Sequence, residues 1–321
     1  MYENILRLIK KYETVIIHRH TNPDGDAIGS QAGLRELILA NFPGKNVYCV
    51  GDKPRRYAFM DGSSPDTIPD GYYSGALAII LDCSAASLIA DERYKLAAET
   101  LRIDHHIFCE KIADTELTDT SFESCCGLIA DIARESGLIL TPAAAKSLYT
   151  GLVTDSGRFR YDSTTSRTFA LASYLTSQPF DLNDIYGKLY VDDYSNMRMR
   201  AIFVLKIKFT KNNVAYIYST EQELKELGIE PFAASRGMVG TMADMRGVDV
   251  WVNFTEANGE IWAEIRSSKY NINPVAVKYG GGGHAKASGA TLKDRDTAMK
   301  MLADLDALAK QAPSDDSSAA N

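Results

Sequence analysis

Short apolar segments alternate with helical segments along the first half of the chain, and this order constrains the fold more than any other feature. The apolar segments have the length of buried strands and lie at residues 14–18, 47–50, 76–81 and 101–103. The helical segments lie at residues 27–40, 122–136, 142–152 and 165–176. Two parallel strands must be joined by a long crossover, and a helix between them provides this connection. Strands that alternate with helices therefore predict parallel pairs. We therefore predict an α/β fold with a parallel sheet covered by helices.

A second, smaller α/β domain is predicted for the C-terminal part of the chain. The 321 residues exceed what one core usually holds, which favours two domains. We expect a first domain over residues 1–185, a polar helical connector over 186–200 and a second domain over 201–310. Within the second domain, the Asn258-Gly259 pair predicts a tight turn between two strands. The last residues, 311–321, are rich in Ser, Asp and Ala and are expected to be disordered.

The composition argues against several classes of protein. Lys and Arg number 35 against 42 Asp and Glu, and the formal net charge of −7 argues against binding of long nucleic acid. No apolar run reaches the length of a membrane-spanning helix and the N-terminus lacks a secretory signal, so we expect a cytoplasmic protein with no membrane partner. The five cysteines are an odd number without C-x-x-C spacing, which predicts neither a disulfide framework nor a zinc ribbon.

Asp and His residues follow the ends of the predicted elements. They are His20, Asp24 and Asp26 after the first strand, then Asp82, then Asp104, His105 and His106, and finally Asp155 after residues 151–154. In open α/β sheets the functional site forms at the carboxyl ends of strands. A single Asp is more commonly a turn former or a helix cap, but four motifs that all deliver Asp or His favour a metal site. His18 shares the strand face of His20, and we expect it to be a hydrogen-bonded core residue.

The order and spacing of these motifs resemble those of the DHH phosphoesterases, a family that includes exonucleases and family II pyrophosphatases. The matching motifs are His20-x-x-x-Asp24-x-Asp26, Asp82, Asp104-His105-His106 and Asp155-x-Gly157. The resemblance implies one metal held by His20, Asp24 and Asp82. It implies a second metal held by Asp26, Asp82, His105 and Asp155, so that Asp82 bridges the two.

Two residues of the third motif are expected to have catalytic roles beside these ligands. Asp104 would orient a metal-ligating imidazole, and His106 would face the substrate phosphate. Imidazole and carboxylate ligands without thiolate favour two manganese ions over magnesium, with zinc and iron as alternatives. The chain departs from the family pattern after Asp82, where residues 83–87 lack the acidic residue and the arginine that relatives often carry.

A glycine-rich segment in the second domain predicts an anion site. Four glycines, residues 280–283, precede His284. Glycines let backbone amides approach an anion closely and the imidazole adds a donor, although a flexible turn is the alternative. Together with Arg266, this segment resembles the DHH-associated domain. The resemblance implies that the substrate's phosphate is bound by Arg266, Gly281, Gly282, Gly283 and His284.

The combination of both domains is most similar to the oligoribonuclease and pAp phosphatase branch of the family, also called nanoRNases. This implies hydrolysis of very short oligonucleotides to mononucleotides by a water activated between two metals, and removal of the 3′ phosphate from adenosine 3′,5′-bisphosphate. A phosphodiesterase for cyclic dinucleotides or linear pApA is one alternative, and a catalytically silent nucleotide-binding module is another. The sequence leaves open the preference for RNA or DNA and the oligomeric state, a homodimer included.

Overall fold

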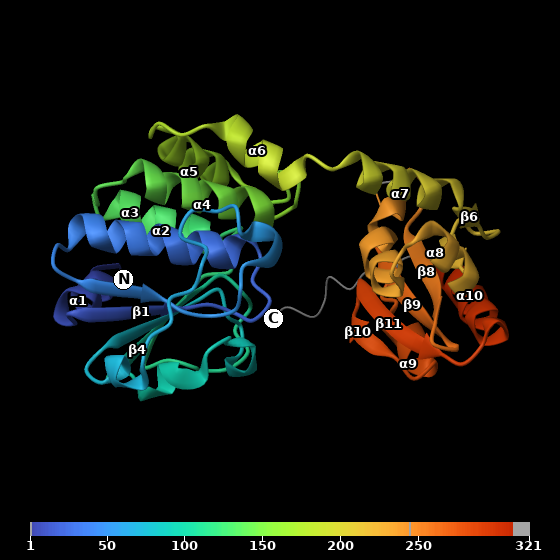
Figure 1. Ribbon diagram of the computed structural model, residues 1–321, viewed down its shortest axis with the longest axis horizontal. Coiled ribbons are helices and arrows are strands. Elements are labelled where there is room, and N and C mark those ends of the chain that lie inside the picture. Colours follow the sequence, from blue (N-terminus) through green and yellow to red (C-terminus); the bar gives the residue numbers. More distant parts are fainter. Residues whose placement is uncertain (1, 244, 311–321) are drawn as a thin grey trace. The chain divides into compact units, whose positions relative to one another are not determined.

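A computed structural model describes residues 2–243 and 245–310, which form two compact units (Figure 1). The first unit extends to Val191 and the second begins at Asp192. The predicted connector, residues 186–200, contains the end of α6 (Leu182–Tyr190) and the beginning of α7 (Tyr194–Leu205). The predicted disordered tail, residues 311–321, lies outside the described residues.

A parallel five-stranded sheet forms the centre of the first unit, which confirms the predicted α/β fold. The strand order is β2-β1-β3-β4-β5, and the strands are β1 (Thr14–His18), β2 (Asn46–Cys49), β3 (Leu77–Leu81), β4 (Glu99–Asp104) and β5 (Thr115–Thr118). Every neighbouring pair in this sheet is parallel. The apolar pattern does not predict β5, because Leu117 is its single aliphatic side chain.

Helices cover one face of this sheet and shorter elements cover the other. The helices are α1 (Tyr2–Lys11), α2 (Gly25–Asn41), α3 (Cys125–Glu135), α4 (Pro142–Asp155), α5 (Ser166–Thr176) and α6. In β3, Leu77, Ile79 and Leu81 belong to the helix-side core. Ala78 and Ile80 belong to a second cluster on the opposite face. All five residues of β3 are buried, as expected of a strand covered on both faces.

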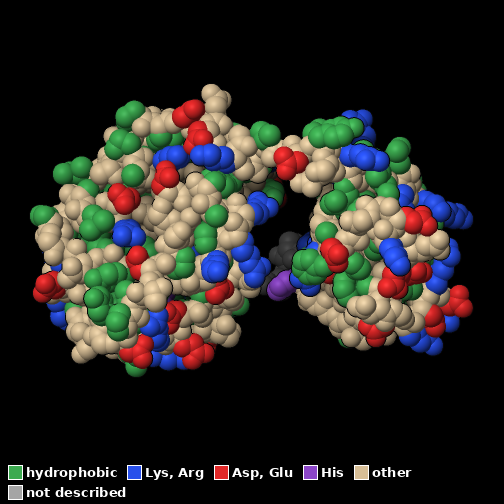
Figure 2. All heavy atoms as spheres, viewed as in Figure 1, with side chains coloured by type: hydrophobic (Ala, Val, Ile, Leu, Met, Phe, Trp, Pro, Cys, Tyr) green, Lys and Arg blue, Asp and Glu red, His purple; other side chains and the backbone are tan. Residues whose placement is uncertain are grey.

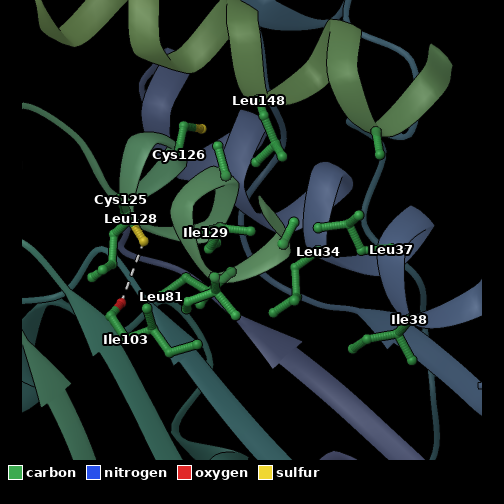
Figure 3. Close-up of a cluster of buried hydrophobic side chains, with 14 of the residues drawn as sticks. Leu34, Leu37, Ile38, Leu81, Ile103, Cys125, Cys126, Leu128, Ile129 and Leu148 are labelled. Atoms are coloured by element: carbon green, nitrogen blue, oxygen red, sulfur yellow. Dashed lines mark hydrogen bonds between the residues drawn. The ribbon is translucent and has the colours of Figure 1, made fainter. Parts of the chain in front are cut away.

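The helix-side core brings α2, α3 and α4 together, and Figure 3 shows the aliphatic side chains that fill it. The Cys125 thiol of α3 donates to the Ile103 carbonyl oxygen of β4 at 3.3 Å. A Cβ atom at Gly29 of α2 would lie 2.6 Å from the carbonyl oxygen of Ser147 in α4. A Cβ atom at Gly151 would lie 2.2 Å from the Cys126 sulfur. These glycines let α2 and α4 approach closely, so the first turn of one helix meets the last turn of the other.

The second unit is built on a six-stranded mixed sheet, which agrees with the predicted smaller α/β domain. Its strand order is β10-β11-β9-β8-β7-β6, and the strands are β6 (Lys208–Phe209), β7 (Ala215–Ser219), β8 (Val250–Ala257), β9 (Glu260–Ser267), β10 (Gly282–His284) and β11 (Ala287–Leu292). The helices are α7, α8 (Glu221–Leu227), α9 (Asn273–Lys278) and α10 (Arg295–Ala309). Asn258 and Gly259 join β8 to β9 with φ values of 55° and 78°, which is the predicted tight turn.

No described helix is both long and apolar enough to cross a membrane. On the face drawn in Figure 2, acidic and basic side chains are interspersed on both units. On this face the basic side chains form no continuous stripe of the kind that binds long nucleic acid.

Candidate active site

The ends of the central elements of the first unit bring six predicted metal ligands into one cluster. His20 lies two residues beyond β1 and Asp82 directly follows β3, while His105 directly follows β4. Helix termini supply the rest, because Asp24 is the N-cap of α2, Asp26 lies in its first turn and Asp155 ends α4. The ligand atoms of these side chains and of His106 form three overlapping groups, and within each group all atoms lie within 4.8 Å of one another. The groups are His20, Asp24 and Asp82; Asp26, His105 and Asp155; and Asp82, His105 and His106.

The two carboxylate oxygens of Asp82 face two different imidazole rings. Its Oδ2 atom lies 3.5 Å from Nε2 of His20, and its Oδ1 atom lies 3.4 Å from Nε2 of His105. Asp82 is buried, and its Oδ1 atom has no hydrogen-bond partner among the described residues. Its φ of 56° is also a left-handed value that costs free energy outside glycine. A buried carboxylate oxygen that lacks a donor and is held in a strained backbone fits a bridging metal ligand.

The remaining carboxylates lie around the same two rings. Nε2 of His20 is 3.7 Å from Oδ1 of Asp24. Nε2 of His105 is 3.4 Å from Oδ2 of Asp155 and 3.8 Å from Oδ2 of Asp26. The residues therefore divide into one set around His20 and another around His105, with Asp82 common to both.

The other nitrogen of each ring faces a backbone carbonyl oxygen. Nδ1 of His20 lies 2.8 Å from the oxygen of Thr21, and Nδ1 of His105 lies 3.4 Å from the oxygen of Phe122. A carbonyl oxygen can only accept, so each Nδ1 carries a proton. This arrangement directs Nε2 of both rings toward the carboxylates, as is usual for metal-ligating histidines.

The pKa values of the cluster report an excess of negative charge. Burial lowers the pKa of His20, but Asp24 and Asp82 outweigh this and raise it to about 11. In the same way, Asp82, Asp26 and Asp155 outweigh burial and raise the pKa of His105 to about 10. Burial and the nearby Asp82 raise the pKa of Asp155 to about 6 although His105 opposes this shift. Protons balance this negative charge in the absence of a metal, and bound divalent cations would balance it in place of the protons.

The N-terminus of α3 holds Asp26 in this cluster. Both of its oxygens accept backbone N–H groups, from Cys125 at 2.7 Å and from Cys126 at 2.9 Å. Burial and the carboxylates of Asp82 and Asp155 raise the pKa of Asp26 well above its usual value. The helix N-terminus partly offsets this repulsion, because its free N–H groups and dipole favour a negative charge.

Asp104 contacts His106 rather than one of the six predicted ligands. Its carboxylate is fully buried and accepts from the Arg102 guanidinium and, at 2.8 Å, from Nδ1 of His106. The contact to Asp104 raises the pKa of His106. His106 is half-exposed and lines a cavity of about 210 Å³ together with the metal cluster. Asp104 thus orients the imidazole that borders this cavity.

His18 is buried as predicted, but the predicted hydrogen bond is wrong. Its ring lies 5.7 Å from the Tyr73 ring and 6.0 Å from the Tyr94 ring, measured between centroids. Neither of its nitrogens has a hydrogen-bond partner within the described ranges. Burial lowers its pKa to about 4, so the ring is neutral near pH 7. Alternation along β1 correctly predicts its burial but carries no information about a partner for its nitrogens.

The predicted anion-binding residues of the second unit line a single cavity of about 820 Å³. The strand register explains why they meet, because Ala287 of β11 pairs with Arg266 of β9 on one side and with His284 of β10 on the other. A Cβ atom at Gly281 would lie 2.1 Å from the Gly289 carbonyl oxygen, so a side chain is excluded there. Gly283 has a φ of 132°, a conformation that favours glycine. The cavity is lined by Arg266, Gly281, Gly282, Gly283 and His284 among others.

The sequence analysis missed other residues of this cavity, notably Arg236, Trp262 and Glu264. Glu264 accepts from Arg236 at 3.1 Å and from Arg266 at 3.2 Å, so it holds both guanidinium groups. The alternation of β9 places Trp262, Glu264 and Arg266 on one face, and this signal could have identified the first two. Arg236 lies in a separate helical turn, Ala233–Gly237, and no spacing relates it to the strand.

Each of the two units matches a known domain family. Residues 14–152 match the DHH family, N-terminal domain, and residues 213–311 match the DHHA1 domain. The chain is 34% identical over 314 residues to the bifunctional oligoribonuclease and PAP phosphatase NrnA of Bacillus subtilis (strain 168), with 97% of this chain and 99% of the relative covered. It is 31% identical over 304 residues to the protein of the same name from Mycoplasma genitalium, with 93% and 95% covered.

A solved structure has a similar fold over nearly all of the chain. The crystal structure of an exopolyphosphatase-related protein from Bacteroides fragilis superposes with a TM-score of 0.82 at 25% identity, and 97% of each chain is covered. The identities over nearly the full chain, the two domain matches and the order of the four motifs lead to one assignment. The chain belongs to the DHH phosphoesterase family and carries both a DHH domain and a DHHA1 domain.

Proposed function

We propose that this protein is a two-metal phosphoesterase that hydrolyses short oligoribonucleotides to mononucleotides and removes the 3′ phosphate from adenosine 3′,5′-bisphosphate. The observation that carries the proposal is the buried Asp82 carboxylate, which presents one oxygen to each of two imidazoles and has one oxygen without a donor among the described residues. The names of the relatives from Bacillus subtilis and Mycoplasma genitalium support the substrate class.

Two divalent cations would stabilise the phosphoryl oxygens and lower the pKa of an attacking water. In this proposal His20, Asp24 and Asp82 hold one cation, and the residues around His105 hold the other together with Asp82. The second set is Asp26, Asp82, His105 and Asp155. We propose manganese as the native metal, because imidazole nitrogens account for two of the ligands and magnesium prefers oxygen.

His106 is proposed to contact the substrate phosphate. Its Nδ1 atom is engaged by Asp104, which leaves Nε2 for the cavity that the metal cluster lines. Since Asp104 raises the pKa of His106, the ring is more readily protonated and can donate a charge-assisted hydrogen bond to a phosphoryl oxygen. Arg102 fixes Asp104 from the opposite side.

The second unit is proposed to bind a phosphate of the nucleotide. Arg266 can form two parallel hydrogen bonds to a phosphate, and Gly281 and Gly283, which line the same cavity, carry no side chain of their own that would block an anion. His284 adds a donor beside them. A cytoplasmic location completes the proposal, since all five cysteines are free thiols, the state expected in a reducing compartment.

A metal-reconstitution experiment with defined substrates tests the proposal. The protein is depleted with a chelator, reloaded with manganese or magnesium, and incubated with RNA of two to ten nucleotides, with adenosine 3′,5′-bisphosphate, with pApA and with a cyclic dinucleotide. We expect mononucleotides from the shortest RNAs and AMP from the bisphosphate, at higher rates with manganese. Full activity in chelator would remove the two-metal mechanism. Turnover confined to pApA or the cyclic dinucleotide would reassign the substrate.

A further inference from the structure

Two arginines of the first unit stack on tyrosine rings, and neither arginine forms an ion pair with a carboxylate among the described residues. The Arg158 guanidinium lies 4.5 Å from the centroid of the Tyr190 ring, and the Arg56 guanidinium lies 4.7 Å from that of Tyr57. Throughout the described residues, no Asp or Glu oxygen lies within ion-pair distance of either arginine.

These four residues come from three segments and form one group, which we call the arginine–tyrosine cluster: Arg56, Tyr57, Arg158 and Tyr190. Leu189, the neighbour of Tyr190, packs against a buried hydrophobic cluster that contains Tyr57, so the two arginine–tyrosine pairs lie on adjoining segments. In agreement with this, burial raises the pKa of Tyr190 and the charges of Arg158 and Arg56 both lower it. Tyr190 ends α6 and is 37% exposed, which leaves a face of the cluster open to solvent.

The cluster lies next to two helices that carry metal ligands, α2 and α4. Arg158 follows Asp155 by three residues. Tyr57 packs in one buried cluster with Ile28 of α2, the helix that Asp24 caps. Burial raises the pKa of Tyr57, and the Asp24 carboxylate raises it further. Asp24 and Asp155 both line the cavity of the metal cluster. The two arginines therefore place positive charge beside the helix ends that carry Asp24 and Asp155.

A strained turn holds Arg158 in this position. Gly157, Arg158 and Phe159 all have left-handed φ values, of 57°, 62° and 62°. Two of them are not glycine, and such residues cost about 1–3 kcal/mol each where the surrounding structure retains them. The ring of Phe159 stacks on Phe169 at 5.2 Å, and its N–H donates to the buried Ser156 hydroxyl at 3.1 Å. Anchoring of Phe159 leaves the neighbouring Arg158 exposed.

We propose that the arginine–tyrosine cluster binds the substrate phosphate adjacent to the scissile one. This inference rests on the proposed function, since it assumes that the metal cluster holds the scissile phosphate. Guanidinium groups bind phosphate bidentately, and a tyrosine ring beneath the guanidinium fixes its plane. The cluster would favour substrates that carry a second phosphate, which oligonucleotides and nucleoside bisphosphates share and simple phosphate esters lack.

Dinucleotides that differ by one terminal phosphate test this assignment. The variants Arg158→Ala and Arg56→Ala are compared with wild type on ApA, pApA and ApAp, with manganese present. We expect kcat/KM to fall about tenfold to a hundredfold on pApA or ApAp and to remain close to wild type on ApA. Arg158→Lys should recover part of the loss, because it retains the charge but not the bidentate contact. Arg7→Ala, whose guanidinium contacts Asn4 within α1, is the matched control and should leave all rates unchanged.

A binding measurement separates failure of this inference from failure of the proposed function. Dinucleotides with a methylphosphonate at the scissile position resist hydrolysis, and their affinity for the manganese-loaded protein is measured by calorimetry with and without a terminal phosphate. Wild type should bind the phosphorylated form more tightly, and either arginine variant should remove the difference. Equal affinity of wild type for both forms, or equal losses of the variants on both, would overturn the assignment. Absence of ApA and pApA turnover in wild type would instead count against the proposed phosphoesterase activity.

Discussion

At the scale of single residues, the charge of Asp82 is the feature on which the proposed mechanism depends most. Asp82→Asn keeps the size of the side chain but removes the charge that faces both imidazoles. We expect manganese affinity to fall by about a hundredfold and turnover to be lost with it. Metal content per chain by atomic emission and the rate on pApA are the two measurements.

Asp131→Asn is the matched control for this change. Asp131 is also a nearly buried carboxylate of the first unit, but its partners are Tyr2 and Arg134 rather than the cluster. The Asp131→Asn variant should keep the manganese content of wild type. A normal manganese content in Asp82→Asn would show that Asp82 is not the bridging ligand.

His18 makes the stability of the protein sensitive to mild acid. Its folded pKa of about 4 lies below the ordinary value of 6.5, so the unfolded chain binds a proton between these values and the folded protein does not. The contribution of a neutral His18 to the stability is therefore fully present above pH 6.5 and is lost progressively as the pH falls toward 4. The shift corresponds to about 3 kcal/mol.

Urea unfolding in chelator, from pH 8 to pH 4, tests this expectation. His18→Phe should keep the packing against Tyr73 and Tyr94 and lose less stability over this range than wild type does. Parallel curves for the two proteins would show that His18 does not titrate as the structure indicates.

At the scale of elements, the contact between α2 and α4 positions Asp26 and Asp155. Gly151→Ala would place a methyl group against the Cys126 sulfur and 3.0 Å from the Gly25 carbonyl oxygen. We expect a loss of about 1–3 kcal/mol in the free energy of unfolding, because the packed helices must separate. Metal affinity should fall as well, since both helices carry ligands.

Gly187→Ala in α6 provides the control for the helix contact. A Cβ atom there meets no atom within 4 Å, so this change should be neutral or stabilise the protein by about 0.4–1 kcal/mol. Thermal unfolding of both variants, followed by manganese titration, gives the comparison. Equal stability of the two variants would mean that the close approach at Gly151 does not constrain the helices.

At the scale of the whole molecule, the metal cluster lies in the first unit and the cavity of Arg266 lies in the second, so changes in the second unit should affect substrate binding without affecting the metals. Arg266→Ala should lower kcat/KM on a dinucleotide by about tenfold to a hundredfold, because a charge-assisted contact to phosphate is lost. A minimal activated phosphate ester should be hydrolysed almost unchanged, and the metal content should remain normal. Both substrates are assayed on one enzyme preparation.

Arg295→Ala is a suitable control in the same unit, because this arginine stacks on Tyr218 and does not line the cavity. It should leave both rates unchanged. Equal losses of Arg266→Ala on the dinucleotide and the small ester would assign Arg266 to catalysis or to the stability of the fold.

The sequence by itself determined the fold class, the family and the candidate chemistry. Alternation of strands and helices predicts the parallel sheet, and residues placed directly after β1, β3 and β4 must meet at one edge of it. The role of helix cap, which is common for a single Asp, also applies to Asp24, because Asp24 caps α2 and its oxygen accepts the N–H of Asp26. These features depend on the local pattern of apolar and polar residues and on the order of the strands along the chain, and both can be read from the sequence.

Only the tertiary structure decided which side chains meet across distant segments. Asp104 orients His106, Glu264 joins Arg236 to Arg266, and the ring of Tyr190 comes to lie beneath Arg158. These contacts depend on the close approach of helices and on left-handed turns, whose geometry follows from packing of the whole unit rather than from the residues beside them. Periodicity assigns a side chain to a face, but the partner on that face is fixed by elements elsewhere in the chain.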